Sequence, residues 1–239
     1  MTRALAGRTA LVTGASRGIG EATARSLAAL GARALLVARH AAALDRLAGE
    51  LGHGALALAT DLTESGATER LAARVLAALD GAPDIMVHAA GSFPLAAVEA
   101  TTDADLDLAL ALNVAAPLRL TRDLLGAMRA RGSGDVVTIG SVADRTVFPG
   151  NATYAASKHA VRAVHETLRM ETRGSGVRAT LVSPAATDTA LWDPHDPDAA
   201  PHLPSRTEML RAADVADAVA WAVTRPAHLD VEEIRLARS

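Results

Sequence analysis

Tyr154 and Lys158, in the stretch YAASK, place a phenol and an ammonium group four residues apart. Residues at this spacing lie on the same face of a helix, so both side chains can point into one cleft. A free phenol has a pKa of about 10 and is a poor base at neutral pH, but a neighbouring ammonium favours its ionised form. We therefore expect Lys158 to lower the pKa of Tyr154, which can then exchange a proton with a carbonyl or alcohol oxygen.

The presence of a lysine rather than an arginine at position 158 also points to a specific role. Lys158 is the single lysine among the 24 basic residues of the chain, and Tyr154 is the single tyrosine. An ammonium is a compact charge with three donors, whereas a guanidinium is broad and planar, so arginine would replace it poorly beside a phenol. A solvated pair on a surface helix is the alternative interpretation, but it gives no reason to retain one lysine in an arginine-rich sequence.

A glycine-rich turn, TGASRGIG at 13–20, joins an apolar run to a helical pattern. Gly14, Gly18 and Gly20 let the backbone turn tightly and approach a pyrophosphate, which the N–H groups and dipole of the following helix can hold. A plain tight turn is the alternative, and the spacing G-x-x-x-G-x-G differs from the commoner G-x-G-x-x-G. Because the turn lies between an expected strand and an expected helix, it predicts a dinucleotide-binding site.

Apolar runs alternate with helical patterns along the whole chain. Strands are expected at 9–14, 34–39, 55–60, 84–91, 135–141, 177–183 and 231–237, and helices at 19–31, 42–52, 64–79, about 103–130, 152–173 and 212–224. Continuous apolar strands between helices indicate a parallel sheet covered on both faces. We predict a Rossmann-type, doubly wound α/β fold of about seven strands, forming a single domain over residues 1–239. The segment 193–205 holds four prolines and is expected to be part of a substrate loop at about 190–207.

Composition excludes several classes of function. The formal net charge of −3 gives no general attraction to nucleic acid or to an anionic membrane. The chain has no cysteine, which excludes disulfides and thiolate chemistry. No apolar stretch approaches the roughly 20 residues that span a bilayer, and the N-terminal stretch lacks the apolar run of a signal peptide. We expect a cytoplasmic protein that binds neither nucleic acid nor membrane and needs no metal.

With both motifs in place, nearly the whole sequence resembles the short-chain dehydrogenase/reductase family. The order and spacing of Asn113, Ser141, Tyr154 and Lys158 are similar to the catalytic tetrad of that family. The resemblance implies that Ser141 donates a hydrogen bond to the substrate carbonyl and that Asn113 holds a water of the proton relay. It also implies that Lys158 contacts the nicotinamide ribose. A turn role for Ser141 and a packing role for Asn113 remain the alternatives.

The end of the second expected strand bears on the choice of cofactor. Family members that use NAD place an acidic residue there, whereas this chain reads VARH, with Ala38 followed by Arg39. Together with Arg17, this guanidinium would pair with a 2′-phosphate, so the resemblance implies NADP(H); two solvated surface arginines are the alternative. The implied cofactor-binding residues are Gly14, Ser16, Arg17, Gly18, Ile19, Gly20, Arg39, Asp61, Leu62, Ala89, Gly91, Tyr154, Lys158, Pro184, Ala185, Thr187 and Thr189.

Two positions depart from the family pattern. His88 begins HAAG where the family often reads N-N-A-G, and we interpret it as a core histidine. Ala185 follows Pro184 where the family reads Pro-Gly, and because alanine takes positive φ less easily than glycine, we expect some disturbance of the nicotinamide contact. His195 and His202 are expected to be loop or substrate-rim residues without metal.

The resemblance implies an NADPH-dependent oxidoreductase that reduces a small ketone or aldehyde to an alcohol, or runs the reverse reaction. A 3-oxoacyl-thioester reductase is the alternative, although the glycine-rich ending usual in those enzymes is replaced here by RPAHLDVEEIRLA. A non-catalytic NADP(H)-binding protein is a further alternative. The resemblance also suggests a homotetramer or homodimer that packs the helices at about 103–130 and 152–173.

Overall fold

A computed structural model describes residues 3–239 of the chain. Its centre is a sheet of seven strands in the order β3-β2-β1-β4-β5-β6-β9, in which every neighbouring pair is parallel. This arrangement confirms the predicted doubly wound α/β fold. The strands are β1 (Thr9–Thr13), β2 (Arg33–Ala38), β3 (Leu56–Ala59), β4 (Ile85–His88), β5 (Gly134–Ile139), β6 (Val177–Pro184) and β9 (Glu233–Leu236).

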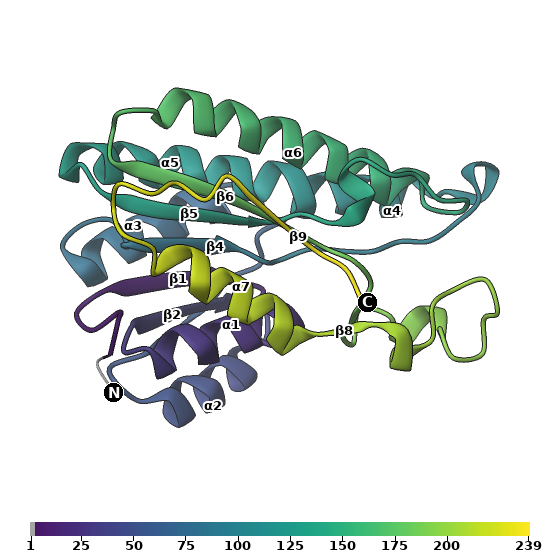
Figure 1. Ribbon diagram of the computed structural model, residues 1–239, viewed down its shortest axis with the longest axis horizontal. Coiled ribbons are helices and arrows are strands. Elements are labelled where there is room, and N and C mark those ends of the chain that lie inside the picture. The colour runs from purple at the N-terminus through teal and green to yellow at the C-terminus, as the bar shows by residue number, and fades with distance from the viewer. Residues whose placement is uncertain (1–2) are drawn as a thin grey trace.

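Helices cover both faces of the sheet (Figure 1). One layer consists of α1 (Gly18–Ala29), α2 (Ala41–Leu51) and α7 (Ala212–Val223), and the other contains α3 (Ala67–Leu79), α4 (Asp103–Leu110), α5 (Ala116–Arg131) and α6 (Ala152–Thr172). Each helical layer packs against one face of the sheet and forms a separate apolar core with it. Within residues 3–239, the buried apolar side chains are Ala, Val, Leu, Ile and Met, so the cores contain no aromatic ring.

The helix expected at about 103–130 is interrupted. A π-helical turn, Ala111–Ala115, separates α4 from α5 and contains the buried Asn113. Pro117 stands in the first turn of α5 and has no N–H, so the usual α-helical hydrogen bond from residue 117 to the Asn113 carbonyl cannot form. Turns of this kind are frequent at functional sites. The helix expected at 64–79 begins later, at Ala67, because Gly66 precedes it with a φ of 70°.

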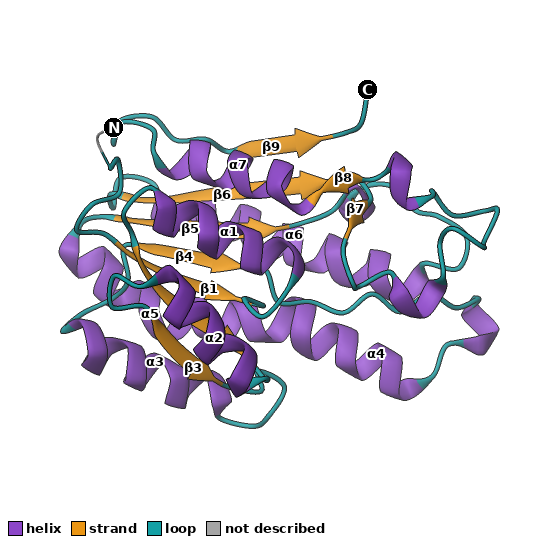
Figure 2. Cartoon of the chain, turned by 90° about the horizontal axis from the view of Figure 1, so that it is seen from below, coloured by secondary structure: helices purple, strands orange, loops and turns teal. Residues whose placement is uncertain are grey.

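The proline-rich segment forms a lid beyond the carboxyl ends of the strands (Figure 2). Two short strands, β7 (Thr187–Asp188) and β8 (Leu210–Arg211), pair at its base. Between them the chain makes turns and two short 3₁₀ helices, Asp193–His195 and Arg206–Glu208. Among residues 3–239, no helix combines the length and apolar character that crossing a membrane requires.

Candidate active site

The glycine turn closes tightly over the carboxyl end of β1. Gly14 has a φ of 70°, and a Cβ at this position would lie 2.8 Å from the Ala89 carbonyl oxygen. A Cβ at Gly20 would collide with the Gly14 carbonyl. Only glycine fits both positions without a steric clash. The turn leads directly into the amino terminus of α1, where free N–H groups and the helix dipole favour the binding of a phosphate.

Three segments meet around this turn, where the strand order reverses between β1 and β4. The Thr13 hydroxyl accepts hydrogen bonds from the N–H groups of Ala89 and Ala90, at 3.1 Å each. From the other side, a Cβ at Gly18 would lie 3.2 Å from the Thr189 methyl group. Parallel α/β sheets bind dinucleotides at such a switch point, and the cradle formed here fits a pyrophosphate.

The remaining residues implied for the cofactor lie at the same edge of the sheet. Ser16 and Arg17 lie in the turn, and Ile19 lies in the first turn of α1. A Cβ at Gly91 would approach the Asn113 Oδ1 to 3.0 Å, which places the loop after β4 beside the π-helical turn. The other positions are distributed over the carboxyl ends of the strands: Leu62 after β3, Pro184 and Ala185 at the end of β6, and Thr187 in β7.

A polar cavity of about 530 Å³ opens beside the end of β2. Hydrogen bonds from the Thr63 hydroxyl and N–H, at 2.6 and 2.9 Å, lower the pKa of Asp61. The positive charge of Arg39 lowers that pKa further, so Asp61 is ionised. Arg70 and Arg74 also line this cavity and were not predicted from the sequence, although their spacing of four residues places them on one face of α3. The lining residues are Arg39, Ala59, Thr60, Asp61, Glu64, Ala67, Arg70, Leu71 and Arg74.

Tyr154 and Lys158 point from α6 toward the end of β5. The Lys158 ammonium donates a 2.9 Å hydrogen bond to the Ile139 carbonyl and lies 5.5 Å from the centroid of the Tyr154 ring. Its side chain is buried, and it forms no ion pair with any of residues 3–239. Burial lowers the pKa of Lys158 to about 8, against an opposing contribution from the negative charge of Asp144.

The expected lowering of the Tyr154 pKa is wrong for this structure. Burial raises it to about 12, and the negative charge of Asp144 adds to this rise, whereas the Ser141 hydroxyl lowers it. The physical reason is that Lys158 directs its ammonium to a backbone carbonyl rather than to the phenol oxygen. Tyr154 is therefore a neutral acid at pH 7, with the buried Lys158 ammonium nearby.

Ser141 and Asn113 approach the pair from two other elements. Ser141 lies two residues after β5 and caps the short helix Val142–Asp144, and its hydroxyl accepts a hydrogen bond from the Ala143 N–H at 3.1 Å. The Asn113 amide bonds both the N–H and the carbonyl of Ser92, at 2.8 and 3.0 Å, and donates to the Ser157 hydroxyl at 2.9 Å. Asn113 therefore fastens the loop after β4 to the helix that carries Tyr154.

Asp144 is a buried acid that was not predicted from the sequence. One carboxylate oxygen accepts the Ser183 hydroxyl at 2.5 Å and the Ser141 N–H at 3.4 Å. The other accepts the Arg145 guanidinium at 2.9 Å, and Arg145 also pairs with Glu233 on β9. The spacing S-x-x-D from Ser141 to Asp144 is that of a capping box and was the available signal.

Aromatic side chains gather over Tyr154. The Phe93 ring lies 4.6 Å from the Tyr154 ring and 4.7 Å from the Trp192 ring, centroid to centroid, with edge-to-face geometry. His195, expected to be a loop or rim residue, lies in the lid with its ring 5.2 Å from Phe93. His202 is exposed on the lid. Trp192 lies in the substrate loop expected at about 190–207, but neither it nor Phe93 was identified individually from the sequence.

The two departures from the family pattern have local structural explanations. His88 is buried and bonds the Thr121 hydroxyl at 2.8 Å, and burial lowers its pKa to about 3, so it is a neutral core residue. Ala185 donates its N–H to the Leu236 carbonyl at 2.8 Å. It is not among the residues with positive φ in the described part of the chain. Ala185 therefore carries no backbone strain from a positive φ, and the expected disturbance of the nicotinamide contact stays a prediction.

Comparisons with known proteins agree with this arrangement. Residues 8–200 match the sequence profile of the short chain dehydrogenase family. An uncharacterized oxidoreductase of Mycobacterium tuberculosis is 39% identical over 234 residues, covering 95% of this chain and 89% of the relative. A metagenomic short-chain oxidoreductase in complex with NADP has 31% identity and a TM-score of 0.84, covering 99% of both chains. An NADP-bound 3-oxoacyl (acyl-carrier-protein) reductase from Agrobacterium tumefaciens has 31% identity and a TM-score of 0.85, covering 99% of this chain and 95% of its own.

Proposed function

The chain belongs to the short-chain dehydrogenase/reductase family, and from that premise we propose that it is an NADPH-dependent reductase of a ketone or aldehyde. One observation carries the proposal: Tyr154, Ser141 and a buried Lys158, which forms no ion pair with any of residues 3–239, lie together at the carboxyl end of β5. Neighbouring groups with shifted pKa values, as at Tyr154 and Lys158, are typical of a catalytic site.

The nicotinamide cofactor, when bound, supplies a hydride to the carbonyl carbon. Tyr154 donates its proton to the carbonyl oxygen as the carbon–oxygen double bond becomes a single bond. Ser141 donates a hydrogen bond to the same oxygen, which stabilises the negative charge that develops there. Lys158 stabilises the tyrosinate that remains, and Asn113 holds the water through which a proton returns. The balance is one hydride and one proton added to one carbonyl.

The raised pKa of Tyr154, about 12, keeps the phenol protonated at pH 7. Tyr154 can therefore act as a general acid toward the forming alkoxide.

NADP(H) is the proposed cofactor because of the positive charge beside β2. Arg39, Arg70 and Arg74 line the cavity there with Asp61 and Glu64. A 2′-phosphate can pair with Arg39, whereas the ribose hydroxyls of NAD find no acid at position 38. Arg17 stands in the neighbouring turn and is not among the cavity residues.

A 3-oxoacyl-thioester reductase is the second candidate, because a solved structure with that activity in its name covers 99% of this chain. We further propose that one domain, residues 1–239, holds both the cofactor and the substrate. The proposal includes a cytoplasmic homodimer or homotetramer, in keeping with the family resemblance.

The test is oxidation of NADPH and NADH across a panel of carbonyl compounds. The panel holds aryl ketones, aldehydes, small keto acids and an acetoacetyl thioester, with Tyr154→Phe as the control. Turnover with NADPH that disappears in Tyr154→Phe, while NADPH binding persists, supports the proposal. Tight NADPH binding without turnover of any compound contradicts it, and preference for NADH contradicts the cofactor assignment.

A further inference from the structure

The aromatic residues of this chain are concentrated at one place. The chain holds two phenylalanines, two tryptophans and one tyrosine, and Phe93, Trp192 and Tyr154 lie in one contiguous cluster. Phe148 and Trp221 are about half exposed, at 48% and 49%. Because the described apolar cores contain no aromatic ring, the cluster is not an extension of core packing.

Phe93, Trp192 and His195 form what we call the aromatic wall. Phe93 is at its centre, in edge-to-face contact with the rings of Tyr154, Trp192 and His195. Its backbone is held from two sides, because Asn113 bonds Ser92 and the His195 Nε2 lies 2.8 Å from the Phe93 carbonyl. The wall is therefore a fixed surface that joins the lid to the loop after β4.

The aromatic wall lies where it would contact a substituent of a carbonyl compound bound at Tyr154. A carbonyl oxygen bonded to the Tyr154 hydroxyl brings its carbon substituents beside the ring of the same tyrosine. Phe93 packs on that ring, so one substituent meets the wall. Aromatic rings favour edge-to-face and offset contacts with other rings, and the wall offers several ring edges and faces in one small region.

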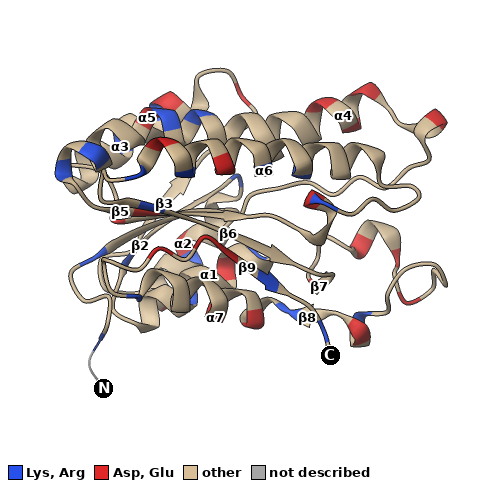
Figure 3. Ribbon diagram, turned by 45° about the horizontal axis from the view of Figure 1, so that its top comes forward, with Lys and Arg blue, Asp and Glu red and all other residues tan. Residues whose placement is uncertain are grey.

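The charges around the wall disfavour an anionic substrate. The segments 92–102, 141–153 and 189–208 contain only two Arg or Lys residues, Arg145 and Arg206. Arg206 pairs with Asp188 at 2.5 Å and with Asp193 at 2.6 Å, and Arg145 pairs with Asp144 and Glu233. The lid also carries further acidic residues (Figure 3). A substrate carboxylate or phosphate therefore finds no free arginine or lysine in these segments.

We propose that the aromatic wall is the substrate-recognition surface and that the preferred substrate is an uncharged ketone or aldehyde bearing an aromatic ring. This inference rests on the proposed reductase function and narrows its substrate class. We therefore expect keto acids and phosphate-bearing thioesters to be poorer substrates than aryl ketones.

Trp192 offers a readout of the wall that does not depend on turnover. Trp221 is the other tryptophan of the chain and lies on α7, in the helical layer opposite α6. Trp221→Phe therefore leaves Trp192 as the single indole. Acetophenone is titrated into this variant saturated with NADP⁺, which cannot reduce a ketone. We expect a saturable change of Trp192 emission, whereas Trp192→Phe, which retains Trp221, should show only unsaturable collisional quenching.

Two matched comparisons test the chemistry of recognition. Phe93→Leu in the Trp221→Phe background keeps apolar volume but removes the central ring, and we expect acetophenone to bind roughly three- to tenfold more weakly. 4-Acetylbenzoate carries the same ring with a carboxylate, and we expect it to bind more weakly than acetophenone. Should Phe93→Leu not fold, Trp192→Leu carries the test through the ratio of kcat/KM for acetophenone to kcat/KM for 2-butanone, which should fall by a similar factor.

The outcomes separate this inference from the proposed reaction. Saturable acetophenone binding at Trp192 without reduction of any carbonyl supports the wall and contradicts the reductase. Tyr154-dependent reduction of aliphatic ketones, keto acids or a thioester, with no acetophenone binding, supports the reductase and overturns the wall. Equal binding of acetophenone and 4-acetylbenzoate overturns the preference for an uncharged substrate.

Discussion

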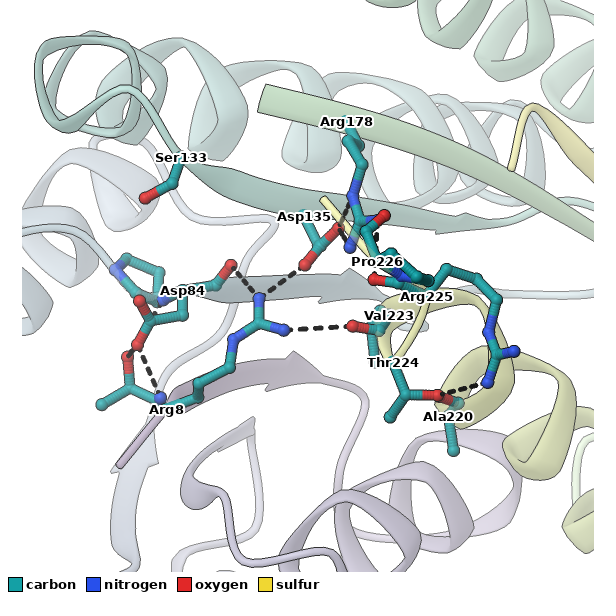
Figure 4. A network of polar contacts seen from close by, with 12 residues as sticks. Arg8, Asp84, Ser133, Asp135, Arg178, Ala220, Val223, Thr224, Arg225 and Pro226 are labelled. Carbon is teal, nitrogen blue, oxygen red and sulfur yellow. Dashed lines mark hydrogen bonds and ion pairs between the residues drawn. The ribbon is translucent and has the colours of Figure 1, made fainter. Parts of the chain in front are cut away.

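Two buried charged groups at opposite ends of the sheet, Asp135 and Lys158, differ in whether they have a counter-ion. At the amino ends of the strands, one carboxylate oxygen of Asp135 forms an ion pair with Arg8 at 2.5 Å, and the other forms an ion pair with Arg178 at 2.7 Å (Figure 4). Arg178 also donates to the carbonyls of Arg225, Pro226 and Leu229. At the carboxyl ends, the buried Lys158 has one carbonyl as its hydrogen-bond partner and no carboxylate in contact among residues 3–239.

This difference separates a structural network from a reactive one. A charge with a full set of partners has little left to offer a ligand, and its network joins β1, β4, β5 and β6 with the chain after α7. A buried charge without a counter-ion has a shifted pKa and retains the capacity to stabilise a group that develops charge during a reaction. The amino end should therefore control stability, and the carboxyl end should control activity.

Tyr154→Phe should give the largest effect and should affect activity alone. Loss of a general acid typically lowers kcat by 10²–10⁴, and we expect roughly 10³-fold. The Phe93 ring can still pack on the new phenyl ring, so the melting temperature and the NADPH affinity should stay close to those of the unaltered protein. Steady-state rates, thermal melts and NADPH titration of one preparation check this. A fall in melting temperature as large as that of an Asp135 variant would contradict the claim that Tyr154 controls activity and not stability.

Asp135→Ala should show the converse behaviour. This substitution leaves Arg8 and Arg178 without their carboxylate partner. A broken buried ion pair usually costs more, but Arg8 is 29% exposed, so we expect the free energy of unfolding to fall by about 2–3 kcal/mol. For a chain of this size the melting temperature should fall by roughly 5–10 °C. The kcat of the folded fraction should be unchanged, which rate measurements well below the melting temperature check.

Glu166→Ala is the matched control for Asp135→Ala. It removes the surface partner of Arg162, an exposed i,i+4 pair, and should cost less than about 0.5 kcal/mol. If both variants lower the unfolding free energy equally, burial of the Asp135 network is not what makes it important.

Arg39→Gln sharpens the comparison within the carboxyl end. Arg39 lines the cavity at β2, and removal of its pairing with a 2′-phosphate should lower the ratio of kcat/KM for NADPH to kcat/KM for NADH roughly tenfold. The exposed Arg46 on α2 is the control, and Arg46→Gln should leave the ratio unchanged. An equal effect of both substitutions would mean that general positive charge, and not a contact, selects the cofactor.

The features that sequence reasoning predicted depend on local pattern. Continuous apolar runs separated by helical spacing were sufficient for the parallel sheet, because a strand buried on both faces has few polar positions. Tyr154 and Lys158 share a helical face by spacing alone, and the glycine turn follows β1 directly. The position of such motifs along a chain determines their place at the carboxyl edge of the sheet.

The features that were missed depend on contacts between distant segments. Asp144 meets Ser183 across 39 residues, and Phe93 meets His195 across 102 residues. The pKa of Tyr154 also depends on its burial in the folded protein rather than on the nearest charge in the sequence. The π-helical turn at Asn113 had a local signal in Pro117, but a proline near the start of a helix is compatible with a regular helix as well.

Asp144→Asn should give the smallest effect, visible in the pH dependence. The charge of Asp144 favours the protonated forms of Tyr154 and Lys158 and so raises the pKa of each. In the unaltered protein, reductase activity should fall above about pH 8 as Lys158 loses its proton. Without the negative charge this loss comes more easily, so the alkaline decline should move to lower pH by roughly half a unit, equivalent to about 0.7 kcal/mol.

Ser183→Ala separates the charge of Asp144 from its hydrogen bonding. It removes the 2.5 Å contact to the carboxylate but leaves the negative charge in place, so the alkaline limb of the profile should not move to lower pH. The same shift in Ser183→Ala and Asp144→Asn would mean that Asp144 acts by positioning Ser141 and not by charge. The carboxyl end would then differ from the amino end in its geometry alone, because at both ends the acid would serve as a structural partner.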